Sequence, residues 1–397
     1  MIHLVFLIPT LERIGGAESQ VLLLAEGLAR RGWKVTLITL SGDALSRTES
    51  SGPRDRIRER LETAGVTLLS LGMRKAWVDP CGWYRYLTWA HSNPPDIVHA
   101  HLPHAAWFAR FVRLLVPVPM VVETIHTTRK VSTRGRLLTQ LSNWLCDRTT
   151  CVSEAVAQSA LRASAIPTRK LTVLPNGIQL NSEWASRLDA KNELCESSPG
   201  FHWLAVGRLA PVKDYPTLLR AFAEVSRRAA EDEAAAPWLT IAGAGPEEDS
   251  LCRLAEDLQI SSHVHFAGFQ HDVQPLLAAA DAFVLTSRWE GLPIGLLEAQ
   301  AASLPVVATD GPGTAHAMID GQTGFLVPVG SVPLLAKAMI KVMAMPCCQR
   351  THMGRMGRDF VEAAYSLDAV LDQWENLYRE QLEEQPQPSR RACEGLR

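Results

Sequence analysis

The sequence lacks several patterns that mark common classes of protein. Its eight cysteines form no C-x-x-C pair, which argues against a zinc ribbon. No apolar run reaches the roughly 18 residues of a transmembrane helix, and the apolar N-terminal segment has neither a basic leader nor a small-residue cleavage site. We therefore expect no membrane-spanning segment, and we interpret residues 2–8 as a first strand.

Two further absences concern ligands. No Asp-x-Asp pair occurs in the chain, so a carboxylate-held metal is not indicated. The first predicted strand is not followed by G-x-G-x-x-G, which removes the main support for a nicotinamide-binding domain. Gly243 and Gly245 also lack a third glycine, and the proline and acids that follow them fit an ordinary helix start.

The composition describes a folded, enzyme-like protein. Of its 397 residues, 47% are hydrophobic and 21% are charged, and chains of this length usually form two domains of about 150–200 residues. The net charge of −2 conceals an asymmetry, because residues 1–177 carry 22 basic and 13 acidic side chains. This basic half suggests an anionic partner, either a membrane surface or a phosphorylated acceptor; surface charge that drifts without function is the alternative.

Apolar, β-branched runs alternate with helical patterns in both halves of the chain. In the first half, strands are predicted at residues 2–8, 34–40, 66–71, 96–101, 120–126, 148–153 and 171–174. In the second half, they are predicted at residues 202–206, 238–242, 264–267, 282–286, 305–309 and 325–327. This alternation predicts an α/β fold of two Rossmann-like, doubly wound parallel-sheet domains, with a cleft between them as the default ligand site.

The domain boundaries follow from shifts in composition. A polar segment without a strand signal predicts a linker at residues 181–200, between a first domain at 1–180 and a second at 201–352. Residues 353–382 are predicted to form helices that pack back toward the first domain. The Pro- and charge-rich residues 383–397 are predicted to be a disordered tail.

The segment EGLPIGLLE, at residues 290–298, carries the strongest ligand signal. It follows an apolar strand and enters a helix, so its free N–H groups and the positive end of the helix dipole suit phosphate. Glu290 and Glu298 stand at its two ends, where their carboxylates can accept hydrogen bonds from sugar hydroxyls.

Two other strand ends carry residues that suit a phosphorylated ligand. Gly16 lies between the first strand and the first helix, where the missing Cβ allows a phosphate or sugar to come close; a plain tight turn is the alternative. Arg208 and Lys213 follow the first strand of the second half, and this pair of cations suits a diphosphate. Surface solvation is the alternative for either cation alone.

Histidines cluster where one predicted strand ends. His99 and His101 lie on one face of that strand by alternation, and His104 begins the following loop. A metal site must be considered, but no further ligand recurs at a fixed spacing nearby, so a single histidine at the ligand site is expected. His126, at the end of the next strand, is a second candidate, and a hydrogen-bonded structural histidine is the alternative for each.

A basic and apolar stretch occupies residues 129–146. It combines Arg129, Lys130, Arg134 and Arg136 with a helical face rich in leucine. Such a segment could lie on an anionic membrane. The alternative is an ordinary Rossmann helix whose leucines pack on its sheet.

In their order, these motifs resemble the retaining glycosyltransferases of family 4, which have the GT-B architecture of two facing Rossmann-like domains. Six motifs carry the likeness over nearly the whole chain: GGAE at 15–18, the His101 region, PNGI at 175–178, GR-x4-K at 207–213, VHFAGF at 264–269 and E-x7-E at 290–298. Two departures stand out. Gly311-Pro312-Gly313 replaces the family's usual Gly-Gly and glutamate, leaving contacts near His316 open, and Gln179 replaces a common acid.

The resemblance implies a nucleotide-sugar donor held mainly by the second domain. Arg208 and Lys213 would neutralise its diphosphate, Glu298 would bond to the ribose diol, and Glu290 would contact the sugar. The other implied donor contacts are Gly16, Phe266, Leu292, Pro293, Ile294, Gly295 and Leu296.

From the first, acceptor-side domain, the resemblance implies that His101 faces the donor sugar. Together with Arg208, Lys213 and Glu290, it completes the implied catalytic set, and His126, Arg129 and Lys130 are candidates for the acceptor side. The implied reaction retains the anomeric configuration by front-face attack and uses neither a metal nor another cofactor.

These expectations combine into one predicted activity. We expect a hexosyltransferase that moves a hexose or N-acetylhexosamine from a nucleotide-diphosphate sugar, with UDP favoured, to a lipid-linked or glycan acceptor for surface polysaccharide such as lipopolysaccharide, capsule or exopolysaccharide. The expected location is cytoplasmic, with peripheral contact to the anionic inner face of the plasma membrane and no nucleic-acid partner. The alternatives are a nucleotide-sugar epimerase of the same architecture and a non-catalytic sugar-nucleotide binding protein.

Overall fold

The structure is a computed structural model that describes residues 1–12, 14–42, 53–74, 76–127, 132–163, 166–180 and 200–384. Most of the predicted linker and the predicted tail from residue 385 onward therefore lie outside the described residues. Contacts divide the chain into two compact units. Unit 1 comprises Met1–Val152, Ala157–Gly177 and Asp368–Arg397, and unit 2 comprises Ser153–Val156 and Ile178–Leu367.

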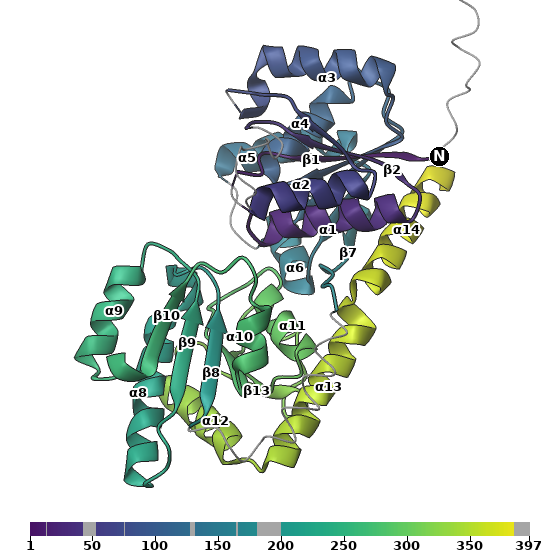
Figure 1. The fold of residues 1–397 in the computed structure, drawn as a ribbon. Helices are drawn as coiled ribbons and strands as arrows, with labels where there is room; N and C mark the ends of the chain where they lie inside the picture. Colours follow the sequence, from purple (N-terminus) through teal and green to yellow (C-terminus); the bar gives the residue numbers. More distant parts are fainter. Residues whose placement is uncertain are drawn as a thin grey trace, which may run out of the picture. The chain divides into compact units, whose positions relative to one another are not determined.

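Unit 1 is built on a seven-stranded parallel sheet with the strand order β3-β2-β1-β4-β5-β6-β7 (Figure 1). Its strands are β1 (His3–Ile8), β2 (Lys34–Thr39), β3 (Thr67–Ser70), β4 (Ile97–His101), β5 (Met120–Ile125), β6 (Arg148–Cys151) and β7 (Leu171–Val173). Its helices are α1 (Gly16–Arg30), α2 (Pro53–Thr63), α3 (Pro80–Ser92), α4 (Pro103–Val112), α5 (Thr133–Ser142), α6 (Glu154–Arg162) and α14 (Leu367–Glu384). Strands β1 and β4 are buried along their whole length, as expected for a parallel sheet covered on both faces.

Side-chain alternation assigns the helices of unit 1 to two faces of its sheet. Val98 and Ala100 of β4 join the core that α3 and α4 form on one face, where Tyr86 meets Phe108 edge to face. His99, between them in sequence, therefore points to the other face, where it contacts Tyr378 of α14. Helix α14, the last helix among the described residues, is thus part of the core of unit 1.

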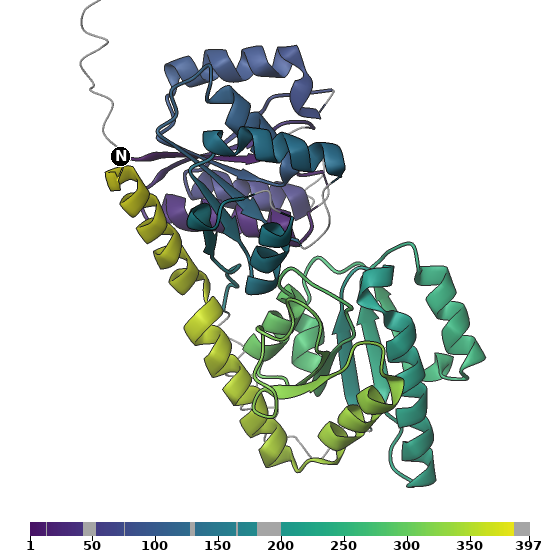
Figure 2. The ribbon, with the colours of Figure 1, turned by 180° about the vertical axis from the view of Figure 1, so that it is seen from behind.

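Unit 2 is built on a six-stranded parallel sheet with the strand order β10-β9-β8-β11-β12-β13. Its strands are β8 (His202–Val206), β9 (Trp238–Ala242), β10 (Val264–Gly268), β11 (Ala282–Leu285), β12 (Val306–Thr309) and β13 (Gly324–Val327). Its helices are α8 (Tyr215–Glu231), α9 (Glu248–Asp257), α10 (Gln274–Ala279), α11 (Ile294–Ala301), α12 (Val332–Ala344) and α13 (Cys347–Tyr365). Helices α8 and α12 lie side by side in both ribbon views (Figures 1 and 2).

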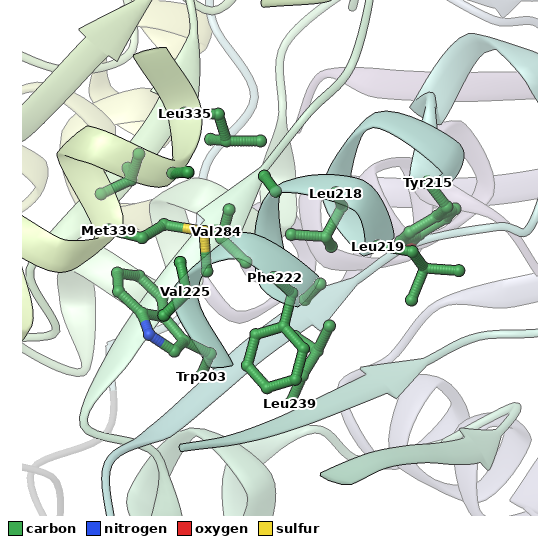
Figure 3. Close-up of a cluster of buried hydrophobic side chains, with 14 of the residues drawn as sticks. Trp203, Tyr215, Leu218, Leu219, Phe222, Val225, Leu239, Val284, Leu335 and Met339 are labelled. Carbon is green, nitrogen blue, oxygen red and sulfur yellow. The ribbon is translucent and has the colours of Figure 1, made fainter. Parts of the chain in front are cut away.

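The core of unit 2 lies between its sheet and the helices α8, α9 and α12 (Figure 3). Trp203 and Leu239 project from β8 and β9 toward Phe222 of α8, and Met339 of α12 closes the cluster beside them. These side chains are fully or almost fully buried, so the hydrophobic effect holds α8 and α12 against β8 and β9.

The helical segment predicted at residues 353–382 divides between the two units. Helix α13 packs on α11 so closely that a Cβ at Gly354 would meet the carbonyl of Ser303 at 1.8 Å, and it therefore belongs to unit 2. Helix α14 buries Trp374 and Tyr378 in unit 1 instead. The break between the helices pairs with PNGI, because Ile178 donates to the carbonyl of Tyr365.

The described residues include no single helix that is both long and apolar enough to cross a membrane. Helices α12 and α13 meet the length and composition criteria only together, across a bend of 114°. Leu335 and Met339 of α12 are fully buried in the core of unit 2.

Candidate active site

The strand order of unit 2 places the predicted donor residues at one point of its sheet. Strands β8 and β11 are neighbours, and the chain leaves them toward opposite edges of the sheet. Ligands of doubly wound sheets bind at the carboxyl ends of the two strands at such a switch point. Arg208 and Lys213 follow β8, and Glu290 follows β11, so the fold brings together the ends of segments more than seventy residues apart in sequence.

Lys213 and Glu290 form a direct ion pair at this point. The Nζ atom of Lys213 lies 2.6 Å from Oε1 of Glu290, and both side chains are mostly buried. The hydroxyl of Ser287 donates to the same carboxylate oxygen at 2.5 Å. The carbonyl of Ser287 in turn accepts from Thr309 at the end of β12, so three strand ends hold the carboxylate.

The backbone of the Lys213 loop is held by the strand end opposite it. The hydroxyl of Thr286 donates to the carbonyl of Lys213 at 2.8 Å, and the amide of Arg288 donates to the carbonyl of Val212. Asp214 follows in the left-handed conformation, with a φ of 50°, as the chain turns into α8. The lysine is therefore held at its backbone by Thr286 and at its ammonium group by Glu290.

Glycines after β8 and β9 allow a close backbone approach that the sequence did not reveal. A Cβ at Gly243 would lie 2.0 Å from the carbonyl oxygen of Gly207, and one at Gly245 would lie 2.1 Å from that of Leu209. The amide of Leu209 also donates to Ala244. The loop after β9 therefore supports the loop that carries Arg208, and this close approach is the structural use of the two glycines.

Arg208 is exposed, and no described residue pairs with its guanidinium. Because no acid among the described residues pairs with it, this guanidinium can bind an incoming anion beside the Lys213 loop. Phe266 is not brought to this group. It lies in β10, at the edge of the sheet, and its side chain packs against the core cluster of unit 2.

Helix α11 begins over the ends of β8 and β11. Pro293 is its N-cap residue, and its carbonyl accepts from the amide of Leu296 in the first turn. The amides of Ile294 and Gly295 precede the first intrahelical bond, as at every helix start. A Cβ on Gly295 would make ordinary contact with Val206, the last residue of β8, so this N-terminus lies at the switch point. Leu292, just before it, is buried.

Glu298 lies in the second turn of α11 and is partly buried. Burial first, and the negative charge of Asp272 second, raise the pKa of its carboxyl to about 7. A carboxylate with two donors from a ribose diol would be stabilised in its charged form, which is the form that this environment alone disfavours. The site is therefore suited to a ligand that supplies hydrogen-bond donors.

The departure from the family pattern after β12 has a structural basis. A Cβ at Gly313, whose φ is 86°, would lie 2.4 Å from the carbonyl oxygen of Glu290, and the amide of Glu290 donates to Pro312. A Cβ at Gly311 would lie 2.8 Å from the carbonyl of Arg288. Both glycines thus permit close packing against the Glu290 loop, whereas the side chain of His316 is exposed.

The switch point of unit 1 lies between β1 and β4. Gly16 opens α1 after β1, and nothing lies within 4 Å of the position that a Cβ there would take. His101 ends β4 and is fully buried. Leu102, directly after it, has a φ of 70°, a strained conformation for a residue with a side chain, and such strain is common at functional sites.

His99, His101 and His126 form a neutral histidine cluster. Nδ1 of His101 lies 2.9 Å from Nε2 of His126, and the rings of His99 and His101 are 4.1 Å apart between centroids. Burial lowers the pKa of His99 and His101 well below the usual value, and the other histidines lower both further. Burial lowers the pKa of His126 to about 4. At neutral pH, these rings are hydrogen-bonding groups and not cations.

Two ring nitrogens of this cluster can each form a further hydrogen bond. Nε2 of His101 and Nδ1 of His126 are buried, and neither has a hydrogen-bond partner among the described residues. An unpaired buried polar atom is costly, so each is suited to a ligand group. His104 is exposed at the start of α4 and lies outside the cluster.

Tyr378 of α14 completes the support of this cluster and was missed by the sequence analysis. Its hydroxyl lies 2.7 Å from Nδ1 of His99, whose Nε2 lies 2.6 Å from the hydroxyl of Thr124. No local pattern could reveal this contact, because 279 residues separate Tyr378 from His99.

Among the described residues, no group of three or more His, Cys, Asp or Glu side chains is arranged to hold a metal ion.

Of the acceptor-side candidates, Arg129 and Lys130 lie outside the described residues. The leucines of α5 do not all pack on the sheet, because Leu137 and Leu141 are exposed by 56% and 67%. The interpretation of this segment as an ordinary buried Rossmann helix is therefore wrong for these two positions.

Comparison with known families bears on both units. A family model described as Glycosyltransferase Family 4 matches residues 14–182, and one described as Glycosyl transferases group 1 matches residues 191–360. The chain belongs to the family 4 glycosyltransferases. This confirms the resemblance that the motifs carried.

Curated relatives of this family 4 glycosyltransferase match parts of its length. It is 33% identical over 174 residues to the lipopolysaccharide core biosynthesis glycosyltransferase LpsE of Rhizobium meliloti, covering 44% of this chain and 48% of that protein. It is 28% identical over 261 residues to an Escherichia coli enzyme named UDP-Gal:alpha-D-GlcNAc-diphosphoundecaprenol alpha-1,3-galactosyltransferase, covering 62% of this chain and 66% of that protein. The alignments thus span about half and just under two thirds of these relatives.

Solved structures confirm the predicted GT-B fold. The chain superimposes on HepE of Anabaena in complex with UDP-glucose with a TM-score of 0.77 and 18% identity, covering 96% of this chain and all of that one. It superimposes on sucrose-phosphate synthase of Thermosynechococcus elongatus with a TM-score of 0.78 and 19% identity, covering 97% and 100%. At these identities, the likeness concerns the fold alone.

Proposed function

We propose that this glycosyltransferase moves a hexose or N-acetylhexosamine from a nucleotide-diphosphate sugar to a lipid-linked or glycan acceptor in surface polysaccharide synthesis, with retention of the anomeric configuration. The observation that carries the proposal is the meeting of Lys213, Glu290 and the N-terminus of α11 at the switch point of unit 2. UDP is the proposed nucleotide, because one relative is named for UDP-galactose and HepE was solved with UDP-glucose.

In the proposed reaction, the bond between the anomeric carbon and the diphosphate oxygen breaks while the acceptor hydroxyl attacks from the same face. Its proton passes to the departing phosphate oxygen. Negative charge builds on the diphosphate, and Arg208, Lys213 and the free amides of α11 are the groups that can stabilise it. The proposed reaction requires no metal, and the lack of an Asp-x-Asp pair in the sequence supports a metal-independent reaction.

Glu290 is proposed to bind the donor sugar and not to act as a covalent nucleophile. Its Oε1 already accepts from Lys213 and Ser287, which lowers the nucleophilicity of that oxygen. Neutral His101 is proposed to bond to a hydroxyl of the transferred sugar through its unpartnered Nε2. A neutral ring can do this without a positive charge that would oppose an oxocarbenium-like transition state.

The acceptor and the location belong to the same proposal. The Escherichia coli relative is named for a diphosphoundecaprenol-linked sugar and the Rhizobium relative for lipopolysaccharide core synthesis, which supports a lipid-linked or polysaccharide acceptor. We place the enzyme in the cytoplasm, in peripheral contact with the inner face of the plasma membrane.

A thermal-shift panel of UDP-, GDP- and ADP-sugars tests the donor, because a ligand that binds the folded state raises the melting temperature by mass action. The donor that shifts it is then incubated with and without lipid-linked acceptors, and the products are separated. Transfer to an acceptor with retention supports the proposal. Isomerised donor without acceptor indicates an epimerase, and binding without turnover or hydrolysis indicates a binding protein; either result overturns it.

A further inference from the structure

Five large apolar side chains of unit 1 face solvent in one region. Leu137, Leu141 and Trp144 are exposed by 56%, 67% and 68%, and Leu114 and Leu115 by 55% and 63%. The first three lie at i, i+4 and i+7, the spacing of one helical stripe, in α5 and the 3-10 turn that follows it at Asn143–Leu145. Exposure of such a stripe of apolar side chains to water is unfavourable, so the stripe indicates a surface that binds a partner.

Hydrogen bonds place the two leucines after α4 beside this stripe. The guanidinium of Arg113, next to Leu114 in sequence, donates to the carbonyl of Leu145, next to Trp144. One turn earlier, Arg110 donates to the carbonyl of Thr139 in the middle of α5. The end of α4 and the end of α5 are thus tied together, and we call their five exposed apolar residues the α4–α5 surface.

The exposed charge beside the apolar stripe is basic. Residues 97–147 contain two acids, and both are paired: Glu123 is buried against Arg110 at 2.6 Å, and Asp147 bonds to Arg113 at 2.7 Å. Arg134 and Arg136 of α5 are exposed, immediately before the apolar stripe. Exposed leucine and tryptophan side chains beside exposed arginines that pair with no described acid are the pattern of a helix that lies in the interface of an anionic membrane.

We propose that the α4–α5 surface is the site at which this protein docks on an anionic lipid bilayer, with the leucines and Trp144 entering the headgroup region and Arg134 and Arg136 contacting lipid phosphates. This inference names the surface for the membrane contact included in the proposed function. It is argued from the exposure and charge of these residues, and its test is separate from the test of sugar transfer.

The charge pattern also decides against a second copy of the chain as the occupant. In a two-fold symmetric dimer, the same patch meets itself. Arg134 and Arg136 would then face a surface whose two acids, Glu123 and Asp147, are already paired with other arginines. Like charges would be brought together at the rim, whereas lipid phosphates would neutralise them.

Flotation of the full chain tests the proposal. The vesicles are phosphatidylcholine alone and phosphatidylcholine mixed with phosphatidylglycerol. The wild type should float with the mixed vesicles and much less with the neutral ones, and added salt should reduce the bound fraction by screening the arginines. The triple variant Leu137→Gln, Leu141→Gln, Trp144→Gln should lose at least about tenfold of its partitioning, because each inserted apolar side chain adds favourable transfer free energy.

Matched variants control for general effects. Ile319→Gln, Val329→Gln and Leu334→Gln remove three exposed apolar side chains of unit 2 and should leave flotation unchanged. Arg134→Gln with Arg136→Gln should reduce binding to mixed vesicles only, whereas Arg220→Gln with Lys337→Gln, exposed in unit 2, should not. The double arginine variant also tests the surface if the apolar triple fails to fold.

Three results would overturn the proposal. The first is flotation of the α5 triple variant at the wild-type level, and the second is an equal loss in the unit 2 controls. The third is a wild type that never floats but sediments as a dimer that the triple variant abolishes, which would assign the surface to a second copy. Nucleotide-induced thermal shifts in the α5 variants separate this failure from failure of the donor proposal, because the substitutions in α5 and the turn after it lie in unit 1.

Discussion

Lys213 and Glu290 are bonded to each other, with 2.6 Å between Nζ and Oε1. A cation proposed for the diphosphate and a carboxylate proposed for the sugar thus hold each other in place. Such preorganisation lowers the cost of aligning both groups at the reacting bond. It also means that donor binding must share or loosen this ion pair.

Lys213→Ala should lower the rate of transfer by about 100-fold or more, because it removes a preorganised positive charge from the leaving group. Affinity for UDP should fall more than affinity for UMP, whose nucleoside contacts are the same. Steady-state transfer assays and calorimetric titrations with both nucleotides measure the two effects. Lys337→Ala, an exposed lysine of α12, is the control, and full turnover in Lys213→Ala would show that the leaving-group role is wrong.

Glu298→Gln should stabilise the unliganded protein at alkaline pH. The pKa of Glu298 is raised to about 7, while the unfolded chain loses this proton near the ordinary value of 4.5. Between these values the folded state binds more protons than the unfolded state, so this group costs stability as pH rises from 4.5 to about 7. The variant should therefore melt higher than wild type at pH 8 and about equally at pH 5.

The same variant should bind nucleotide about tenfold more weakly, because it loses a charged hydrogen bond to the ribose. Melting curves across pH, with and without UDP, measure both effects, and Glu256→Gln on the exposed face of α9 is the control. If Glu298→Gln bound nucleotide as tightly as wild type, the ribose role would be wrong.

Tyr378→Phe should reduce transfer without weakening nucleotide binding. It leaves the buried Nδ1 of His99 without its partner, and the ring of His99 lies against that of His101, so the effect on His101 is one of positioning. We expect a loss of about 1–3 kcal/mol in unfolding free energy and a lower kcat with an unchanged Kd for UDP. Shifted ring-nitrogen resonances of His101 would separate positioning from a general loss of stability.

Tyr86→Phe provides a matched control for that experiment. Tyr86 is equally buried in unit 1, but its hydroxyl has no hydrogen-bond partner among the described residues. Removing it should cost little stability and leave kcat unchanged. Equal losses in the two variants would contradict a specific role for the contact between Tyr378 and His99.

Gly243→Ala should disrupt nucleotide binding through the backbone. The new Cβ would lie 2.0 Å from the carbonyl oxygen of Gly207, so the loop that carries Arg208 must move, at a cost of roughly 1–3 kcal/mol. Thermal melting and UDP titration measure this. Gly16→Ala is the contrast, because its Cβ would meet nothing within 4 Å. It should keep the melting temperature, so that any loss of transfer reports on space needed by substrate.

By itself, the sequence determined the local structure and the kind of site. The alternation of apolar runs with helical patterns marked both parallel sheets, because strand and helix periodicity are properties of neighbouring residues. The positions of Arg208, Lys213, Glu290 and Glu298 after strands or in the following helix indicated an anion site for the same reason.

Only the tertiary structure decided what depends on residues far apart in the chain. Strand order determines which strand ends become neighbours, and so it made Lys213 and Glu290 partners. The packing of α14 on unit 1 put Tyr378 against His99, and the close approach of two loops gave Gly243 its role. The exposed side of α5 follows from the same fact: a helical pattern shows that one face is apolar, but only the packing of neighbouring elements decides whether that face is covered.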